Sequence, residues 1–119
     1  MTSLELARLA AKALDSKKGA NIKVIKVDGV SVIADYFVIA TGFSSTQVRA
    51  LADETEFMLK EAGESVSHIE GHKNDTWILL DYVDVIVHVF SEEAREYYDL
   101  DKMWADGVPV NISDILTPN

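Results

Sequence analysis

Along the first third of the chain, the hydrophobic residues change from a helical spacing to extended runs. Ala7, Ala10 and Leu14 fall on one face of a helix, because an α-helix repeats about every 3.6 residues. A Thr-x-x-Glu capping box at residues 2–5 marks the start of this helix, and a glycine follows its last turn. The pattern therefore predicts a helix over residues 3–18.

The rest of the chain combines short apolar runs with a second long helical pattern. Residues 36–40 form a continuous apolar run, which is typical of a strand that is covered on both faces. Residues 44–62 begin with a Ser-x-x-Gln capping box and keep the helical period up to Gly63. The other predicted elements are strands over residues 22–27 and 66–69, a hairpin over residues 77–90 and a helix over residues 91–98. The sum is an α/β or α+β fold, a mixed sheet of about five strands with helices packed on it.

The hairpin over residues 77–90 is the most informative segment. Two runs rich in β-branched and aromatic residues flank a short polar turn at residues 81–84. The turn contains two acids and a tyrosine but no glycine, and Trp77 opens the first strand. No catalytic constellation accompanies the hairpin, so we expect the function to lie in a surface.

Length and composition describe one globular domain. The chain has 119 residues, of which 48% are hydrophobic, and it contains no cysteine. Disulfides, thiolate metal sites and a cysteine nucleophile are therefore excluded. The start of the sequence does not resemble a secretory signal, and no apolar run approaches the roughly 20 residues of a membrane span, so we expect a cytosolic protein. Both prolines fall within the final 15 or so residues, and residues 106–119 are predicted to form a loosely attached tail.

The net charge limits the kinds of partner. It is −9, with 20 acidic residues against 11 Lys and Arg. Nucleic-acid backbones attract basic proteins, so direct binding of RNA or DNA is not expected as the main activity. The same negative charge favours a basic protein partner, although acids on a surface are also explained by solubility alone.

Two polar motifs suggest chemistry, and an observation counts against each. Residues 42–44, Gly-Phe-Ser, lie between a strand and a helix and could hold a phosphate, but with a single glycine and no lysine after it, a turn glycine followed by an N-cap serine is the preferred interpretation. The acids Asp35, Asp81 and Asp84 suggest a Mg²⁺-dependent nucleotidyltransferase as the alternative function. The acid pair is spaced D-x-x-D and lies nearly forty residues after the serine, which does not match the pattern of those enzymes.

Histidines give two further candidates. His68 and His72 are four residues apart, with Asp75 beyond, a spacing that suits zinc only on a helix, whereas this segment is predicted to be a strand end and loop. His88 lies inside a predicted strand without a nucleophile placed near it in sequence, and a half-buried, hydrogen-bonded structural role is expected. No cofactor is expected.

Aromatic residues gather in the last third of the chain. Both Trp and three of the four Tyr residues lie there, at strand ends, a turn and a helix end: Trp77, Tyr82, Tyr97, Tyr98 and Trp104. Trp and Tyr are the preferred anchors of protein interfaces, because they contribute a large contact area at a small entropic cost. Ordinary packing of the last helix against the hairpin would account for them equally well.

These motifs, taken together, resemble one family. They are Asp35-Tyr36-Phe37-Val38-Ile39-Ala40-Thr41-Gly42, Ser44-x-x-Gln47-Val48, Glu70-Gly71, Trp77, Asp81-Tyr82-Val83-Asp84-Val85-Ile86-Val87-His88-Val89-Phe90 and Arg95-x-Tyr97-Tyr98-Asp99-Leu100-Asp101-x-Met103-Trp104. This order is similar to that of the Iojap family of ribosomal silencing factors, over about residues 3–105. Residues 1–105 are accordingly taken as the family's domain.

The resemblance implies a fold like a nucleotidyltransferase core without its active site, and a protein that is not an enzyme. It implies binding to the large ribosomal subunit through protein number fourteen on the intersubunit face. The bound protein would block the joining of the small subunit and repress translation when nutrients are scarce. It further implies a homodimer in the free state, and a bacterial, cytoplasmic member because no transit extension is seen.

The expected contact surface combines aromatic anchors with acids. Its predicted members are Trp77, Leu80, Asp81, Tyr82, Tyr97, Tyr98, Asp99, Leu100 and Trp104. Trp77 and Tyr98 would be apolar anchors, and Asp81 and Asp99 would meet Lys or Arg. The chain departs from the family in the hairpin turn, where Val83 replaces the usual glycine. Valine resists a positive φ, so this turn is expected to differ or to be strained. The loop at residues 71–75 also has its own composition.

Overall fold

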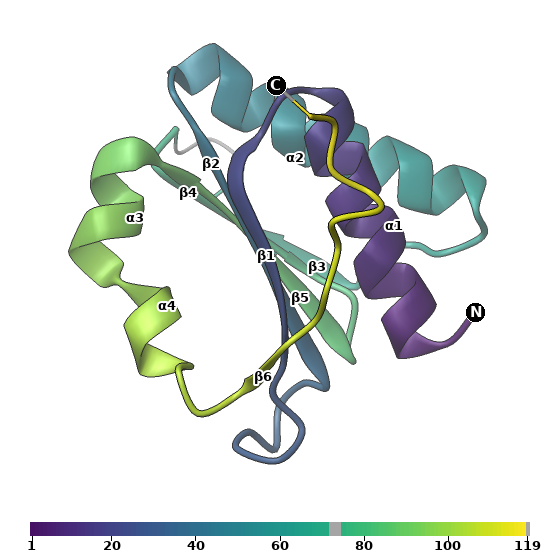
Figure 1. The fold of residues 1–119 in the computed structure, drawn as a ribbon. Coiled ribbons are helices and arrows are strands. Elements are labelled where there is room, and N and C mark those ends of the chain that lie inside the picture. The colour runs from purple at the N-terminus through teal and green to yellow at the C-terminus, as the bar shows by residue number, and fades with distance from the viewer. Residues whose placement is uncertain (72–74, 119) are drawn as a thin grey trace.

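A mixed six-stranded sheet with helices on both faces forms the protein (Figure 1). The computed structural model describes residues 1–71 and 75–118. The helices are α1 (Ser3–Ser16), α2 (Ser45–Glu61), α3 (Glu92–Tyr98) and α4 (Leu100–Met103), and the strands are β1 (Ala20–Lys26), β2 (Tyr36–Gly42), β3 (His68–Glu70), β4 (Trp77–Asp81), β5 (Val85–Ser91) and β6 (Val108–Pro109). The strand order is β3-β4-β5-β2-β1-β6, in which only β2 and β5 run parallel. An α+β fold is thereby confirmed.

Capping residues place the two long helices where the sequence predicts them. The hydroxyl of Thr2 accepts a hydrogen bond from the backbone amide of Glu5. In return, the carboxylate of Glu5 accepts a hydrogen bond from the backbone amide of Thr2. Ser44 caps α2 by accepting from the amide of Gln47. These bonds satisfy amides that have no partner within the helix, so the capping box at residues 2–5 is confirmed. At α2 the serine cap is confirmed, but the side chain of Gln47 accepts a hydrogen bond from the amide of Phe43 and not from that of Ser44.

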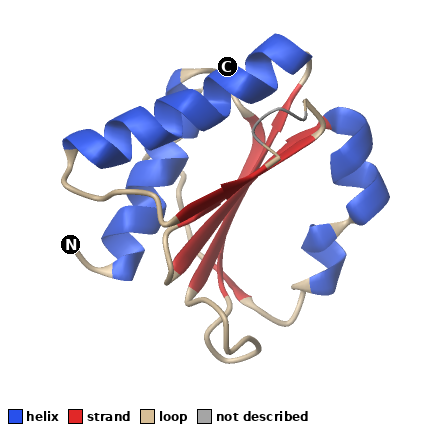
Figure 2. Ribbon diagram, turned by 180° about the vertical axis from the view of Figure 1, so that it is seen from behind, coloured by secondary structure: helices blue, strands red, loops and turns tan. Residues whose placement is uncertain are grey.

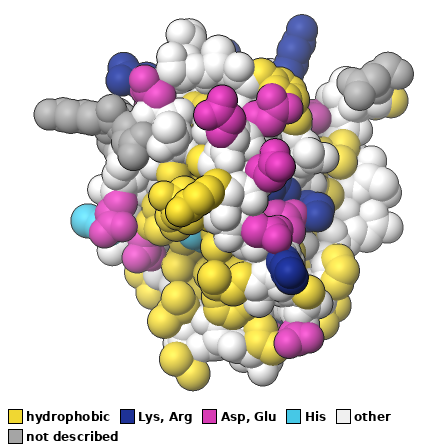
Figure 3. Space-filling view, turned by 90° about the vertical axis from the view of Figure 1, so that its left-hand side faces the viewer, with side chains coloured by type: hydrophobic (Ala, Val, Ile, Leu, Met, Phe, Trp, Pro, Cys, Tyr) yellow, Lys and Arg dark blue, Asp and Glu magenta, His cyan; other side chains and the backbone are white. Residues whose placement is uncertain are grey.

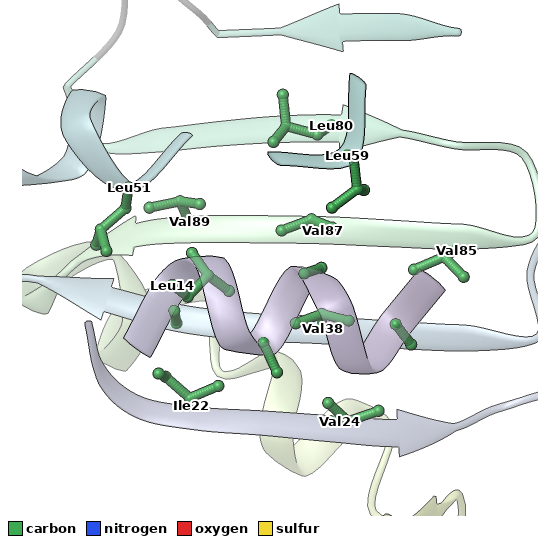
Figure 4. Packing of buried hydrophobic residues seen from close by; sticks show 14 of the residues in the cluster. Leu14, Ile22, Val24, Val38, Leu51, Leu59, Leu80, Val85, Val87 and Val89 are labelled. Atoms are coloured by element: carbon green, nitrogen blue, oxygen red, sulfur yellow. The ribbon is translucent and has the colours of Figure 1, made fainter. Parts of the chain in front are cut away.

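One face of the sheet carries the main core, beneath α1 and α2 (Figure 4). Leu14, Leu51 and Leu59 point from the helices onto Val38 of β2 and Val87 of β5, and all five are fully buried. Every residue of β2 is buried, which confirms the prediction that this strand is covered on both faces.

A smaller core lies on the other face, beneath α3 and α4 (Figure 2). Phe37, Ile39 and Phe90 are buried there, together with Leu100 from α4. The two short helices cover only part of this face, and Trp77 and Leu79 of β4 are partly exposed beside them. The uncovered part of this face is where a surface function is to be sought.

The C-terminal segment differs from its predicted loose attachment. Residues of β6 pair with β1 as a sixth strand, and the amide of Val110 donates to the carbonyl of Val24 at 2.8 Å. Ile112 is buried in the main core, and the carboxylate of Asp15 accepts from the amide and hydroxyl of Thr117. The aliphatic residues among the last ten have apolar surface to bury, and this outweighs the lack of a regular period.

The hairpin turn confirms the expected strain at Val83. This residue has φ 75°, in the region that β-branched residues avoid. The amide of Asp84 donates to the carbonyl of Tyr82 at 3.0 Å, so Val83 is the centre of a three-residue γ-turn. The carboxylate of Asp81 accepts from the amide of Val83 at 2.7 Å and holds the turn.

None of the helices within residues 1–71 and 75–118 is long and apolar enough to cross a bilayer.

Candidate functional site

Strand alternation decides which of the predicted contact residues of β4 share a face. Successive side chains of a strand point to opposite faces of the sheet. Trp77, Leu79 and Asp81 lie on the face of α3, and all three are partly exposed. Leu80 and Tyr82 lie on the opposite face and are buried in the main core. The prediction that these two side chains contribute to a contact surface is therefore wrong, because their parity turns them inward.

The helix pair α3–α4 presents the other predicted residues. Ser91 caps α3 by accepting from the amide of Ala94. Tyr97 and Tyr98 at its end are 82% and 46% exposed, and Asp99 follows with φ 50° and ψ 50°. This left-handed residue redirects the chain, so that Leu100 points into the smaller core with 7% exposure. Leu100 was predicted as a contact and instead anchors α4.

Rings in mutual contact run across this face of the sheet. The centroid of Trp77 lies 4.6 Å from that of Tyr98, which lies 5.0 Å from that of Tyr97. At the other end, Trp104 packs edge-on against Phe37 at 4.8 Å and is partly buried. Trp104 thus contributes mainly to packing. We call Trp77, Leu79, Tyr97 and Tyr98 the aromatic patch.

A shallow hollow of about 220 Å³ lies within the aromatic patch. It is lined by Glu70, Gly71, Thr76, Trp77, Leu79 and Tyr98. Its walls combine the rings of Trp77 and Tyr98 and the side chain of Leu79 with the polar side chains of Glu70 and Thr76. The carboxylate of Glu70 lies 3.1 Å from Nε2 of His68. Such a hollow suits an aliphatic or aromatic side chain of a partner better than a substrate that must be held by several polar groups.

Gly71, directly after β3, lies close against the backbone of Trp77. Its φ is 71°, and a Cβ added to it would lie 2.2 Å from the carbonyl oxygen of Trp77. A side chain does not fit at that distance. The glycine therefore permits the close approach that shapes one wall of the hollow.

His88 lies beneath the patch and is hydrogen-bonded, as predicted for a structural histidine, but it is more deeply buried than expected. Its Nδ1 accepts a hydrogen bond from the indole Nε1–H of Trp77 at 3.2 Å, and the side chain is almost fully buried. Burial lowers the pKa of His88 to about 4, so the ring is neutral at physiological pH.

Acidic residues surround the aromatic patch (Figure 3). Residues 92–106 contain six acids and two basic residues. One of the two, Arg95, is engaged with Asp101, which also pairs with Lys23 at 2.7 Å. Hydrogen bonds from Arg95, together with Lys23, hold the pKa of Asp101 well below its usual range. The exposed charge around the patch is thus mainly negative.

The residues do not support the nucleotidyltransferase alternative. One carboxylate oxygen of Asp81 is bonded to the amide of Val83, and Asp35 accepts from the hydroxyl of Ser3 at 3.3 Å. Within the described residues, no group of three or more His, Cys, Asp or Glu side chains could hold a metal ion. For the zinc alternative, His72 lies outside the described residues.

The Gly-Phe-Ser turn serves the helix rather than a phosphate. The amide of Phe43 donates to the side-chain oxygen of Gln47 at 2.7 Å, and Ser44 caps the helix. A Cβ on Gly42 would lie 2.9 Å from a methyl of Val48, so glycine is needed for packing. The structural interpretation accounts for these residues.

A second hollow of about 370 Å³ lies between β1 and residues 104–112. Its lining is aliphatic and aromatic apart from Lys23 and Asp101, which pair with each other. Nothing in that lining is arranged for chemistry, so the aromatic patch remains the candidate site. Sequence reasoning missed Leu79 as part of it, although alternation from Trp77 gives that residue directly.

Comparison with known proteins gives one family over the whole chain. Residues 1–119 match the family described as "Ribosomal silencing factor during starvation". A "Ribosomal silencing factor RsfS" of Halalkalibacterium halodurans is 38% identical over 98% of this chain and 100% of its own length. Another of Bacillus subtilis is 40% identical over 89% of this chain and 90% of its own length. A crystal structure of a protein from Chromobacterium violaceum superposes with a TM-score of 0.86 at 37% identity, covering 88% of each chain.

Proposed function

Because this chain belongs to the RsfS or Iojap family of ribosomal silencing factors, we propose that it binds the large ribosomal subunit and prevents subunit joining. The contact is with large-subunit protein number fourteen on the intersubunit face. The bound protein occupies the space that the small subunit needs, and translation falls when nutrients are scarce. The family is one of silencing factors and not of enzymes, so the expectation of a non-enzymatic protein is confirmed.

The observation that carries this proposal is the exposed aromatic patch within an acidic surround. Stable interfaces have a core rich in Tyr, Trp and aliphatic residues with a polar rim. Trp77 and Tyr98 contact each other, and both remain partly accessible. Ribosomal proteins are basic where they contact rRNA, and acids around the patch would attract such a partner and speed its association.

Exposure and strand parity support a smaller set of contact residues than the sequence predicts. Trp77, Leu79 and Tyr98 are the apolar anchors, while Tyr97 lies at the rim with 82% exposure. Asp81 and Asp99 meet basic side chains of the partner. The buried Leu80, Tyr82 and Leu100 support the surface from beneath, and the partly buried Trp104 contributes at its edge.

The fold and state of the protein complete the proposal. The core is related to that of nucleotidyltransferases but lacks their active site, so no nucleotide or metal cofactor is required. The protein acts in the bacterial cytoplasm. When free it forms a homodimer, in which a second copy covers the aromatic patch and shields its exposed tyrosines.

Sedimentation of the purified protein with ribosomal subunits tests this function. Isolated bacterial large and small subunits are mixed with the protein separately and then together on gradients. We expect retention on the large subunit alone and a loss of joined ribosomes as protein is added. Absence from the large-subunit fraction at low micromolar concentration would overturn the proposal. Calorimetry with nucleotide and Mg²⁺ distinguishes the enzymatic alternative, for which it would detect binding.

A further inference from the structure

We propose that His88 is a positioning residue for the docking surface, because it fixes the orientation of Trp77 through the indole N–H. The inference rests on the proposed function, since it concerns the same surface. In this role His88 affects binding through Trp77, without touching the partner itself.

The two side chains belong to neighbouring strands and the same face of the sheet. His88 in β5 pairs with Leu79 in β4, and Trp77 pairs with Phe90, so the indole and the imidazole are diagonal neighbours. The Nε1–H of Trp77 donates to Nδ1 of His88 at 3.2 Å. His88 is 4% exposed, whereas Trp77 is partly exposed. The bond thus joins a fixed buried acceptor to a surface donor.

The hydrogen bond selects one form of the histidine. A nitrogen that accepts carries no proton, so the neutral ring carries its proton on Nε2. That second nitrogen is buried and has no hydrogen-bond partner among the described residues. The ring lies instead against Phe37 at 4.9 Å and parallel to Phe90 at 6.0 Å.

Stability alone does not explain a histidine at this position. A buried polar atom without a partner destabilises a folded protein, and an apolar side chain of similar volume would pack among the same rings without that loss. What an apolar side chain cannot supply is the acceptor for Trp77. The useful property of His88 is therefore its Nδ1.

The orientation of Trp77 matters because its other contacts are less directional. The indole lies 5.0 Å from Phe90 and 4.6 Å from Tyr98, between centroids, and ring contacts of this kind allow several tilts. The hydrogen bond selects one of them. An anchor that is already oriented loses less conformational entropy when a partner docks, which tightens binding.

Three variants separate positioning from folding. His88→Leu removes the acceptor while keeping an apolar volume, His88→Gln restores an acceptor oxygen, and Trp77→Phe removes the donor. Each is measured for thermal unfolding and for affinity to isolated bacterial large subunits. In ¹H–¹⁵N spectra, the indole N–H signals of Trp77 and Trp104 are followed, and Trp77→Phe assigns them by loss of one.

We expect His88→Leu to unfold at or above the wild-type temperature and yet to bind large subunits about three- to tenfold more weakly, the loss typical of one side chain that is no longer held. The signal of Trp77 should move upfield while that of Trp104 stays. His88→Gln should recover part of the affinity, and in the Trp77→Phe background His88→Leu should change affinity less than twofold.

Two results would overturn the inference alone. One is wild-type affinity in His88→Leu while the wild-type protein binds large subunits. The other is a parallel loss of affinity and thermal stability that persists in the Trp77→Phe background, which is the behaviour of a merely structural histidine. Failure of the wild-type protein to bind would instead overturn the proposed function and this inference with it. The two failures are therefore distinguishable.

Discussion

The guanidinium of Arg95 in α3 donates two hydrogen bonds, of 2.8 and 2.9 Å, to the carboxylate of Asp101 in α4. The pair spans the break at Asp99, where the chain takes a left-handed conformation. Arg95 also donates to the hydroxyl of Thr41 and the carbonyl of Asn21, both at 2.9 Å. One side chain thus fastens both short helices to strands β1 and β2 and sets the position of the aromatic patch.

Replacing Arg95 by lysine should loosen this attachment. Lysine cannot reproduce the forked geometry, and Asp101 would keep only part of its pairing. We expect the free energy of unfolding to fall by about 2–3 kcal/mol, as measured by urea titration, because the Arg95 side chain is only 11% exposed. The exposed Lys102 provides the control, since Lys102→Met should change stability by less than about 0.5 kcal/mol. Equal effects of the two variants would refute this role.

Relieving the turn at Val83 should stabilise the protein. Glycine adopts φ 75° without the clash that a Cβ introduces, although it also loses more entropy on folding. The balance predicts a gain of about 0.5–1 kcal/mol for Val83→Gly in chemical denaturation. Val83→Ala is the matched control, because it keeps the Cβ and should gain less. A loss of stability in Val83→Gly would show that the turn is not strained.

Adding a methyl group at Gly71 should damage the site. The new Cβ would lie 2.2 Å from the carbonyl oxygen of Trp77, and the residue has a positive φ. We expect Gly71→Ala to cost about 1–3 kcal/mol of stability and to weaken binding of large subunits, because the start of β4 must shift. Gly29→Ala serves as the control, since no atom lies within 4 Å of its added Cβ. Unchanged binding of large subunits by Gly71→Ala would contradict the role of Gly71 in shaping the hollow beside Trp77.

Acid should destabilise the protein through His88. The pKa of this histidine falls from 6.5 to about 4 on folding, so between these values the unfolded chain binds a proton that the folded protein does not. The part of the free energy of unfolding that depends on His88 is therefore constant above pH 6.5. It falls by about 3 kcal/mol in total as the pH drops toward 4. Asp101, whose pKa is lowered, adds its own loss only at lower pH, below its ordinary value of 3.8.

Urea titrations between pH 7.5 and 4.5 measure this decline. The variant His88→Leu should show a shallower fall over the same range, because the shifted histidine is gone. Parallel pH profiles for the wild type and the variant would contradict the prediction.

Local signals in the sequence predict most of the fold. Thr2, Glu5, Ser44 and Gln47 mark the two long helices through bonds that depend only on near neighbours in the chain. The uninterrupted apolar run of β2 likewise predicts a strand buried on both faces. The sixth strand was missed because β6 has two residues and exists only through its pairing with β1, which no local pattern reports.

The candidate site was predicted in part, for a different physical reason. Aromatic composition points to the correct segment, but burial depends on which face a side chain takes. Because side chains alternate along β4, Leu79 and not Leu80 faces the surface. The left-handed conformation of Asp99 turns Leu100 toward the core. The hydrogen bonds of Arg95 to Asn21 and Thr41 join residues more than fifty positions apart, and no spacing pattern in the sequence predicts them.

The central claim is that the aromatic patch docks the protein on the large ribosomal subunit. The most direct test compares the affinity of isolated large subunits for Tyr98→Ala, Trp77→Ala and Phe57→Ala, with circular dichroism and thermal unfolding as folding controls. Phe57 on α2 is a matched aromatic residue, 58% exposed but on the opposite side of the sheet.

We expect Trp77→Ala and Tyr98→Ala each to lose about 2–4 kcal/mol of binding free energy while Phe57→Ala binds like the wild type. Wild-type affinity in folded Trp77→Ala and Tyr98→Ala proteins, or an equal loss in Phe57→Ala, would contradict the account.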